Sequence, residues 1–336
     1  MHDPREAIAA AIEDHGPIAF AEFMELALYG PGGFYATPPV GAGEQAAFVT
    51  SPHVHPIFGR LLGNAIREFW DLLGRPDPFR MSEIGAGDGT LARQLLEVLS
   101  DLPIRYTAIE RSPGARDALA SLEGIDVAEE LSGEPHVALA NELLDNLPFR
   151  RFRGDAEVFV GMDGDRFVEV VADGATYEDT VVPEGSLAFL DRLAAVLAPG
   201  YALLIDYGSA GVPGGPAHGY AAQRVVEDLL ANPGRSDITV GVDFDLVERR
   251  ATSLGLAVLG NVSQHDALRG LGFEAWTREE LSRQARQLDE RKGLDAVRTW
   301  SGRSRATILV DPVALGRHRW LVLGTTGLQA PSWLSG

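Results

Sequence analysis

The sequence has no cysteine and only one lysine, Lys292, among its 336 residues. The lack of cysteine excludes disulfides, thiolate metal ligands and a cysteine nucleophile. A Walker-type phosphate loop needs a Gly-Lys-Ser/Thr sequence, which this chain does not contain. The only close pair of histidines, His53 and His55, is spaced so that a helix would point the two rings in different directions, and we expect no metal site.

Long apolar runs are also missing. No window approaches 18 uninterrupted apolar residues, so we expect no membrane span and no membrane partner. The first residues, "MHDPREAIAAAIEDHG", contain acids and lack the apolar core of a signal peptide. These features predict a cytoplasmic protein.

Positive charge is scarce, with 29 Lys and Arg against 48 Asp and Glu and a net charge of −19. Such a field repels polyphosphate backbones, so we expect no nucleic-acid partner. It suits a cationic or neutral substrate. Hydrophobic residues make up 45% of the chain, which is typical of a globular protein with a large core.

The pattern along the chain predicts an α/β fold. Short apolar runs at 80–84, 104–109, 136–140 and 201–206 alternate with helical patterns at 89–99, 113–121 and 186–198. This alternation is typical of a mainly parallel sheet. Helices are predicted over 4–28, 51–74 and 243–254, mostly helical structure over 264–297, and strands over 256–262 and 318–327.

We predict two regions: an N-terminal helical cap with a substrate loop, 1–78, and a Rossmann-like domain, 79–330. The second would carry a hairpin insertion at 149–182, a Gly/Pro-rich loop at 207–240 and a helical insertion at 264–300. Another Gly/Pro-rich loop, 29–50, contains aromatic residues. Phe34, Tyr35 and Phe48 could wall a substrate pocket or pack the cap onto the sheet.

A glycine-rich turn, "EIGAGDGT" at 83–90, separates the first central strand from a helix. A dinucleotide fingerprint, G-x-G-x-x-G, would need glycine where the chain has Thr90. The G-x-G-x-G spacing after Glu83 is instead typical of proteins that bind S-adenosylmethionine (SAM), whose ammonium group a carboxylate can hold. The alternative is a tight turn without a ligand.

The next strand favours a ligand. It ends in Glu110, and a carboxylate at the tip of the second strand can accept hydrogen bonds from both hydroxyls of a ribose. Together with the glycine turn, this acid predicts an adenosine-bearing cofactor, and the spacing favours SAM.

The chain also resembles a known family. The segments that carry the resemblance are "FAEFMELALYGPGGFYAT", "FVTSPHVHPIFGRLLGNAIREFW", "EIGAGDGTLARQLL", "ANELLDNLP", "LLIDYG" and "DITVGVDF". They are similar to those of the MidA-like SAM-dependent methyltransferases, whose mitochondrial members are protein arginine methyltransferases in complex I assembly. The resemblance implies a class I methyltransferase fold with a mainly parallel seven-stranded sheet.

The resemblance also implies site residues. Cofactor contacts would come from Thr50, Ser51, Pro52, Glu83, Gly85, Ala86, Gly87, Gly89, Glu110 and Asn141. Glu142, Asp145 and Asp206 match motifs of the family, and these three together with His53 are our candidate catalytic residues, without a metal. The product formed from SAM would be S-adenosyl-L-homocysteine. His53 stands where relatives have an acid, and the loop 216–234 departs from theirs at its basic positions.

Methyl transfer from a sulfonium is an in-line displacement that depends on holding the acceptor close to the methyl carbon in a dry site. An arginine acceptor has a pKa above about 12, so carboxylates must orient and polarise it. Glu142, Asp145 and Asp206 could do this, although Asp145 could equally cap a helix. His53 could act as a base for a hydroxyl acceptor.

Three functions follow from this sequence. The first is a SAM-dependent methyltransferase acting on protein arginine. The second is a small-molecule O- or N-methyltransferase, and the third is an assembly factor that binds SAM without turnover. The sequence does not decide the oligomeric state, or whether the loops 29–50 and 207–240 close over the site.

Overall fold

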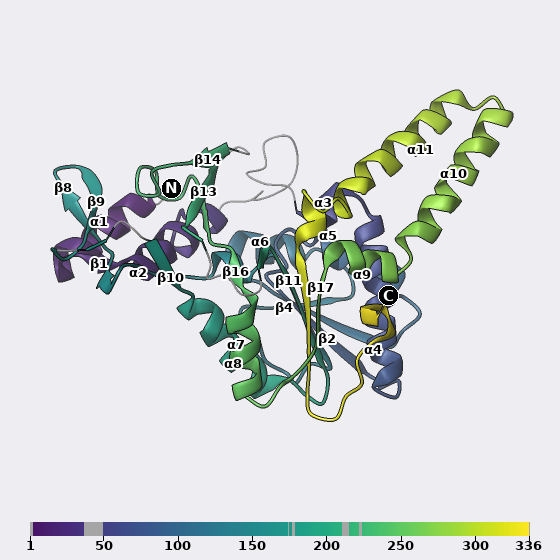
Figure 1. Ribbon diagram of the computed structural model, residues 1–336, viewed down its shortest axis with the longest axis horizontal. Helices are drawn as coiled ribbons and strands as arrows, with labels where there is room; N and C mark the ends of the chain where they lie inside the picture. The colour runs from purple at the N-terminus through teal and green to yellow at the C-terminus, as the bar shows by residue number, and fades with distance from the viewer. Residues whose placement is uncertain are drawn as a thin grey trace.

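A seven-stranded sheet forms the centre of the protein (Figure 1). The structure, a computed structural model, describes residues 3–36, 50–173, 175–176, 179–209, 215–221 and 224–335. Its strand order is β17-β18-β11-β5-β2-β3-β4. In chain order the strands are β2 (Phe79–Ile84), β3 (Ile104–Ile109), β4 (Ile125–Ala128), β5 (Val137–Asn141), β11 (Tyr201–Asp206), β17 (Ala257–Ser263) and β18 (Arg319–Gly324). Only β18 runs antiparallel to its neighbours, so the predicted α/β fold with a mainly parallel sheet is confirmed.

Helices cover both faces of this sheet, which explains why its central strands are continuous apolar runs. One face packs against α4 (Ile57–Leu72), α5 (Thr90–Val98) and α9 (Gln264–Gly270). The other packs against α7 (Glu184–Val196) and α8 (Phe244–Ser253). α6 (Pro113–Leu119) lies beside β4 at the edge of the sheet. Every residue of β11 is buried as a result.

The N-terminal segment forms its own small unit. The helix predicted over 4–28 is interrupted at Gly16, where φ is +80° and Pro17 follows. The segment therefore contains α1 (Pro4–His15), β1 (Ile18–Ala19), α2 (Phe20–Met24) and a π-helical turn, η1 (Glu25–Tyr29). A third apolar cluster joins α1 and α2 to residues far along the chain, including Phe149, Phe167 and Ile238.

The strands of the predicted insertion belong to this unit. β1 pairs with β8 (Phe159–Asp163), which forms a hairpin with β9 (Arg166–Val170). A second small sheet contains β6 (Arg150–Arg153), β7 (Ala156–Glu157) and β10 (Asp179–Val182). Part of the predicted loop 207–240 forms a third, with β13 (His218–Ala221), β14 (Arg224–Val226) and β15 (Asp237–Thr239).

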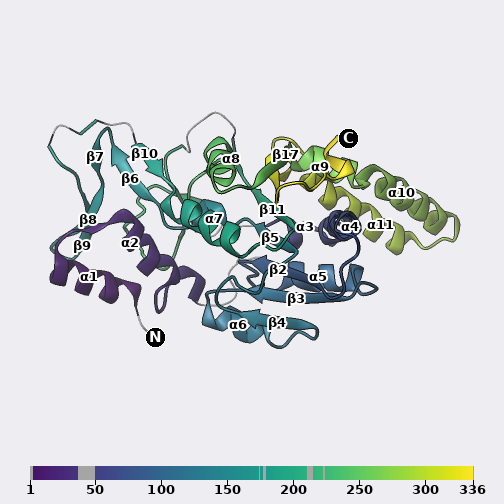
Figure 2. The ribbon, with the colours of Figure 1, turned by 90° about the horizontal axis from the view of Figure 1, so that it is seen from below.

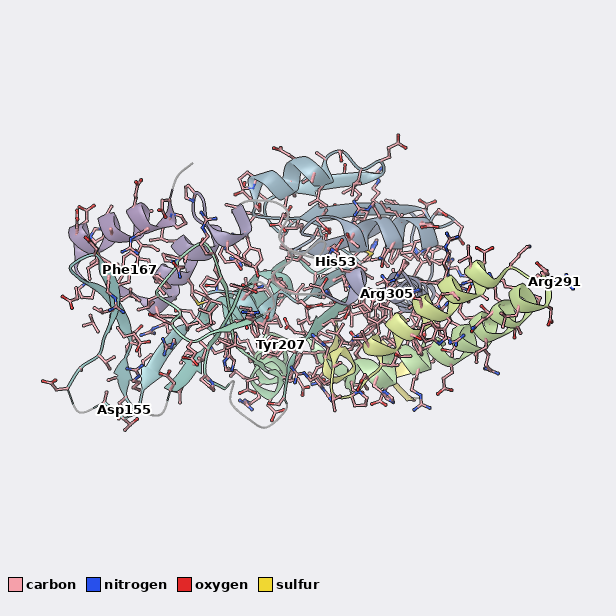
Figure 3. The ribbon with its side chains drawn as sticks, turned by 90° about the horizontal axis from the view of Figure 1, so that it is seen from above. His53, Asp155, Phe167, Tyr207, Arg291 and Arg305 are labelled. Atoms are coloured by element: carbon pink, nitrogen blue, oxygen red, sulfur yellow. The ribbon has the colours of Figure 1, made fainter. Side chains whose placement is uncertain are left out.

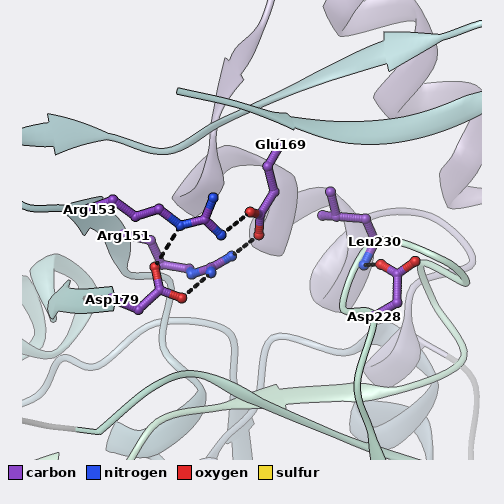
Figure 4. A network of polar contacts seen from close by, with 6 residues as sticks. All are labelled: Arg151, Arg153, Glu169, Asp179, Asp228 and Leu230. Atoms are coloured by element: carbon purple, nitrogen blue, oxygen red, sulfur yellow. Dashed lines mark hydrogen bonds and ion pairs between the residues drawn. The ribbon is translucent and has the colours of Figure 1, made fainter. Parts of the chain in front are cut away.

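An ion-pair network ties the two insertion sheets together (Figure 4). Arg151 is 4% exposed, and its guanidinium donates to Glu169 on β9 at 2.7 Å and to Asp179 on β10 at 2.5 Å. Its other partner is the ring of Phe20 on α2, 4.7 Å from the guanidinium carbon. A buried guanidinium is tolerated because carboxylates on both sides compensate its charge.

The helix predicted over 51–74 is two helices, α3 (Ser51–Val54) and α4, separated at His55 and Pro56. Thr50 occupies the N-cap position of α3. Of the described residues before 79, those up to Tyr35 join the third apolar cluster, whereas α4 packs on the central sheet. The domain boundary drawn after residue 78 stays a prediction.

A helical hairpin projects from the opposite end of the molecule (Figures 1 and 2). It contains α10 (Phe273–Asp289) and α11 (Gly293–Ala306). The mostly helical structure predicted over 264–297, and the helical insertion predicted at 264–300, both end before α11 does. Its base adjoins α9, and the rest of its length extends away from the sheet.

We predict that Phe69→Ala lowers the free energy of unfolding by about 3–5 kcal/mol. Phe69 is fully buried on α4 and stacks on Tyr201 of β11, with ring centroids 4.4 Å apart. Urea denaturation should show a lower midpoint for this variant. Val313→Ala, at a position 85% exposed, is the control and should leave the midpoint nearly unchanged. Equal midpoints for both variants would contradict the packing described.

Candidate active site

A cavity of about 880 Å³ opens at the carboxyl ends of β2, β3 and β5. Ligands of open α/β sheets bind at this edge, and the volume is within the usual range for small-molecule sites. The segments that line it are Glu83–Asp88 at and beyond the end of β2, Glu110–Ser112 after β3, and Asn141–Leu143, which begins with the last residue of β5. Thr50, Pro52 and His53 line it too, and Glu25, Tyr29 and Tyr35 contribute from the N-terminal segment.

Two glycines of the turn have different roles. At Gly87, φ is +54° and a Cβ would have no atom within 4 Å, so the backbone borders open space in the cavity. At Gly89, φ is +75° and a Cβ would come within 2.9 Å of Leu119 and 2.7 Å of Leu122, on the side of α6. Gly87 therefore allows a ligand to approach the backbone, whereas Gly89 allows the turn to pack.

Glu110 is hydrogen bonded to the glycine turn. Its Oε2 accepts from the backbone N–H of Gly87 at 3.0 Å, and its Oε1 from that of Ser112 at 2.8 Å. Glu83 lies deeper and accepts from the hydroxyl of Tyr106 at 2.5 Å. Burial raises the pKa of Glu83 to about 8, against the opposing hydrogen bond from Tyr106. Both predicted cofactor acids line the cavity.

Glu142 has an unusual backbone. Its φ is +53°, a conformation that costs a non-glycine residue about 1–3 kcal/mol. Its N–H donates to Ile205 at 2.7 Å, and its Oε1 accepts from the N–H of Ser51 at 3.1 Å and from Asn141 at 3.3 Å. Burial raises the pKa of Glu142 to about 7 although these hydrogen bonds oppose it. The turn thus holds a carboxyl group at the cavity wall.

Asp206 is fully buried behind that turn and is not among the residues that line the cavity. Its Oδ2 accepts from the backbone N–H groups of Leu143, Leu144 and Asp145 at 3.1, 2.8 and 3.3 Å. Its Oδ1 accepts from the N–H of Tyr207 at 2.8 Å. In this position the predicted catalytic acid supports the loop that carries Glu142 and does not face a substrate.

Asp145 lies in a short 3₁₀ helix, η3 (Leu144–Asn146), also outside the lining. It is 7% exposed, and its Oδ1 has no hydrogen-bond partner among the described residues. Burial raises the pKa of Asp145, and the charges of Asp206, Asp237 and Glu142 raise it further. Of the three predicted catalytic acids, only Glu142 lines the cavity.

Both ring nitrogens of His53 are engaged. Nδ1 is 2.6 Å from the Thr50 hydroxyl and Nε2 is 3.0 Å from the Asp88 carboxylate. Burial would raise the pKa of Asp88, but hydrogen bonds from His53 and Thr90 lower it to about 2. Figure 3 shows His53 near the middle of the molecule. The ring therefore links α3 to the glycine turn and has no free nitrogen to take a proton from an acceptor.

The remaining predicted residues lie around these groups. Ser51 is fully buried and exchanges a hydrogen bond with Gln264 at 3.3 Å, while its N–H holds Glu142. His55 faces away, with its ring 5.2 Å from that of Trp276. Tyr35 lines the cavity, Phe34 packs against its ring, and Phe48 lies outside the described residues.

The sequence reasoning missed a polar network in the wall. The rings of Tyr29 and Tyr35 stack at 5.4 Å, and the Tyr29 hydroxyl donates to Asn146 at 3.1 Å. Asn146 donates to the Tyr35 hydroxyl at 2.7 Å, which in turn donates to Asp237 at 2.8 Å. Asp237 lies in the quoted segment "DITVGVDF", which was the available indication.

Arg111 was missed as well. It follows Glu110, and its guanidinium lies 4.6 Å from the centre of the Tyr29 ring. It also forms an ion pair with Glu25, with one N–O distance of 3.2 Å. These contacts join the N-terminal unit to the tip of β3 beside the cavity.

Residues 61–262 match a protein family described as "Putative S-adenosyl-L-methionine-dependent methyltransferase". The matched segment is more than half of the chain. The chain belongs to this family. It is a SAM-dependent methyltransferase with SAM as its cofactor, and the resemblance seen in the sequence is confirmed.

Curated relatives support this placement. The mouse protein named "Protein arginine methyltransferase NDUFAF7, mitochondrial" is 29% identical over 318 residues, covering 78% of this chain and 72% of the mouse protein. Its human counterpart is 27% identical with the same coverage. The homologue from Drosophila melanogaster is 27% identical, covering 94% of this chain and 83% of the fly protein.

Two solved structures from Burkholderia thailandensis share the fold. One, bound to S-adenosyl-homocysteine, has a TM-score of 0.81 at 24% identity and covers 96% of this chain and 91% of its own. The other has a TM-score of 0.83 at 23% identity and covers 99% and 94%.

The comparisons correct the expected location. The mouse, human and cattle relatives are all named mitochondrial, which contradicts a cytoplasmic location. That expectation rested on the lack of a signal peptide and of a membrane span in the sequence. The names of these relatives outweigh it. Among the described residues, no helix is long and apolar enough to cross a membrane, and no group of three or more His, Asp or Glu could hold a metal ion.

The residues present fit SAM. The cavity is large enough, the backbone at Gly87 borders open space, and two carboxyl groups, Glu83 and Glu110, line the same end. Asn141 also lines the cavity, and its buried Oδ1 has no hydrogen-bond partner among the described residues. A buried acceptor without a partner is uncommon in proteins, and a bound ligand would satisfy it.

We predict that the cofactor-free protein becomes less stable between about pH 5 and about pH 8. Burial raises the pKa of Glu83 to about 8 and those of Glu142 and Asp237 to about 7. The folded chain keeps these protons while the unfolded chain releases them near pH 4, so stability is lost as the pH rises through the folded pKa values.

Urea midpoints measured across this pH range should fall, and Glu83→Gln should make the fall shallower. Asp88, whose pKa is lowered, changes the free energy of unfolding only below about pH 4. Burial lowers the pKa values of His55, His136 and His318, and these groups oppose the fall only below about pH 6.5. A midpoint that stays level or rises between about pH 6.5 and about pH 8 would contradict the burial of these acids in protonated form.

Proposed function

We propose that this methyltransferase acts on arginine side chains of a protein. The observation that carries the proposal is the Glu142 carboxyl group, held at the cavity wall by a left-handed backbone and by the N–H of Ser51. A guanidinium keeps its proton at neutral pH, so an enzyme must hold it by carboxylates and accept its proton as the methyl group is transferred. The names of the mouse and human relatives are consistent with this acceptor.

The charge of the cavity supports a cationic acceptor. Eight carboxyl groups and two arginines line it among the described residues. The acids are Glu25, Glu83, Asp88, Glu110, Glu129, Glu130, Glu142 and Glu184, and the arginines are Arg111 and Arg192. The Arg111 guanidinium already rests on Tyr29 beside Glu25, so this wall contains the aromatic and carboxylate groups that bind a guanidinium.

We assign the roles as follows. Glu110, Gly87 and Asn141 would hold SAM, which supplies an electrophilic methyl group when bound. Glu142 would accept an N–H bond from the guanidinium, orient one nitrogen, and take the proton that this nitrogen loses once its lone pair has formed the new C–N bond. Asp206 would position Glu142 through the loop amides.

A hydroxyl acceptor is less well supported. It needs a base, and the candidate was His53, whose two ring nitrogens are engaged by Thr50 and Asp88. An assembly factor without turnover would not need an acid whose pKa is near neutrality at the cavity wall.

Glu142→Gln should lower kcat by about 10²–10⁴-fold because it removes the proton acceptor. The Kd for SAM should stay within about twofold, since the amide keeps the shape of the side chain. With wild type, kcat should rise as the pH passes through about 7, where Glu142 loses its proton, and the variant should lose this dependence. Glu123→Gln, an exposed acid outside the cavity, is the control.

Mass spectrometry of methyl transfer to arginine peptides and to matched lysine peptides supplies the rates. Transfer to lysine alone, or to neither peptide, would overturn the proposed acceptor. A kcat unchanged in Glu142→Gln would overturn the role of Glu142.

Glu110→Ala should weaken SAM binding by at least about tenfold, because charge-assisted hydrogen bonds from two hydroxyls contribute more than about 1.4 kcal/mol together. Calorimetric titration measures this Kd, with Glu123→Ala as the matched control. Circular dichroism checks folding, since Glu110 also accepts from the N–H groups of Gly87 and Ser112. A folded variant with wild-type affinity would remove Glu110 from the cofactor site.

A further inference from the structure

In the helical hairpin α10–α11, polar side chains lie between the two helices and large apolar side chains lie on the outside. Between the two helices, Gln287 accepts from Thr299 at 2.9 Å and Gln284 from Arg303 at 2.8 Å, so polar side chains fill much of the seam. Large apolar side chains lie outside it: Leu281, Leu288, Val297 and Trp300 are 49%, 57%, 59% and 53% exposed. A hairpin that served only its own chain would bury these residues in the seam.

Three of the exposed apolar residues, Leu281, Leu288 and Trp300, share one face. Leu281 and Leu288 are seven residues apart and lie on one side of α10, about a quarter turn from the seam residues. Trp300 follows the seam residue Thr299 and lies about a quarter turn from the seam of α11. Because the helices are antiparallel, these quarter turns lead to the same face. We call Leu281, Leu288 and Trp300 the apolar face.

The opposite face is charged. Arg283, Arg286 and Arg298 lie about a third of a turn to the other side of the seam and are exposed. The hairpin, residues 273–306, has eight basic and six acidic side chains, whereas the whole chain has a net charge of −19. It is thus a part of the molecule without the negative excess that makes two copies repel each other.

We propose that the apolar face docks onto the same face of a second copy of this chain, so that two hairpins form a four-helix bundle. Each hairpin supplies two antiparallel helices with an apolar side, which is what such a bundle buries. A twofold arrangement of this kind is isologous, and the same patch serves both copies. The charged faces then point outward.

The dimensions allow a stable contact. α10 has 17 residues and is about 26 Å long, and two helices side by side present a face about 20 Å wide. Two such faces together bury about 1,000 Å², the lower limit for a specific interface. Figures 1 and 2 show the hairpin extending clear of the sheet and its helices, so a second hairpin can lie beside it. In Figure 3, Arg291 marks its far end and Arg305 its base.

Sedimentation velocity of the full chain at micromolar concentration tests the proposal. The wild type should have twice the 36.1 kDa mass of one chain. Trp300→Glu should weaken the dimer by at least about 100-fold, since a central tryptophan commonly dominates an interface, and should sediment as one chain. Val313→Glu, an equally drastic change at an apolar residue outside the hairpin, should remain dimeric. Circular dichroism checks that each variant folds.

The absence of native cysteine permits a second measurement. A single thiol in Leu288→Cys should react with maleimide at least about tenfold more slowly once the dimer forms, because it becomes buried. Arg286→Cys, on the charged face, should react at the same rate at all protein concentrations.

Three results would overturn the proposal: a wild type that sediments as one chain, a Trp300→Glu variant that stays dimeric, or dissociation of Val313→Glu as well. A monomer that cosediments with phosphatidylserine vesicles through Trp300 would assign the face to lipid instead.

Discussion

The active site depends on the carboxylate of Asp206. This group ends β11 and accepts hydrogen bonds from successive backbone N–H groups after the neighbouring strand β5. The bonds hold the loop in the turn that gives Glu142 its left-handed backbone and directs it to the cavity wall. The N–H of Ser51 then fixes the Glu142 carboxyl group, and His53, two residues later, fixes the glycine turn through Asp88. One buried acid therefore orders three segments that are far apart in the sequence.

The sequence predicted the cofactor half well because its determinants are local. A strand, a glycine turn and a helix occupy one continuous segment, and the acid at the tip of the next strand is placed by the parallel sheet itself. The central strands and most helices were predicted within a few residues for the same reason. Short β4 was missed because its four residues show no distinctive pattern.

The acceptor half was predicted poorly because its contacts join distant segments. Tyr35 meets Asp237 across 202 positions, and Glu25 meets Arg111 across 86. Nor does sequence distinguish an acid that lines a cavity from one that supports it. Glu142 follows an apolar strand and Asp206 ends one, but only the three-dimensional arrangement shows that backbone amides surround Asp206.

The third apolar cluster has an evolutionary consequence. It holds the N-terminal segment and the insertion strands together without using the two clusters that pack on the central sheet. Tyr29 and Tyr35 come from this separately packed unit, whereas Gly87 and Glu110 belong to the sheet edge. Mutations can therefore accumulate in the unit and reshape the wall beside the acceptor while the methyl-donor site stays intact. Such a division lets one inherited chemistry diverge toward new acceptors.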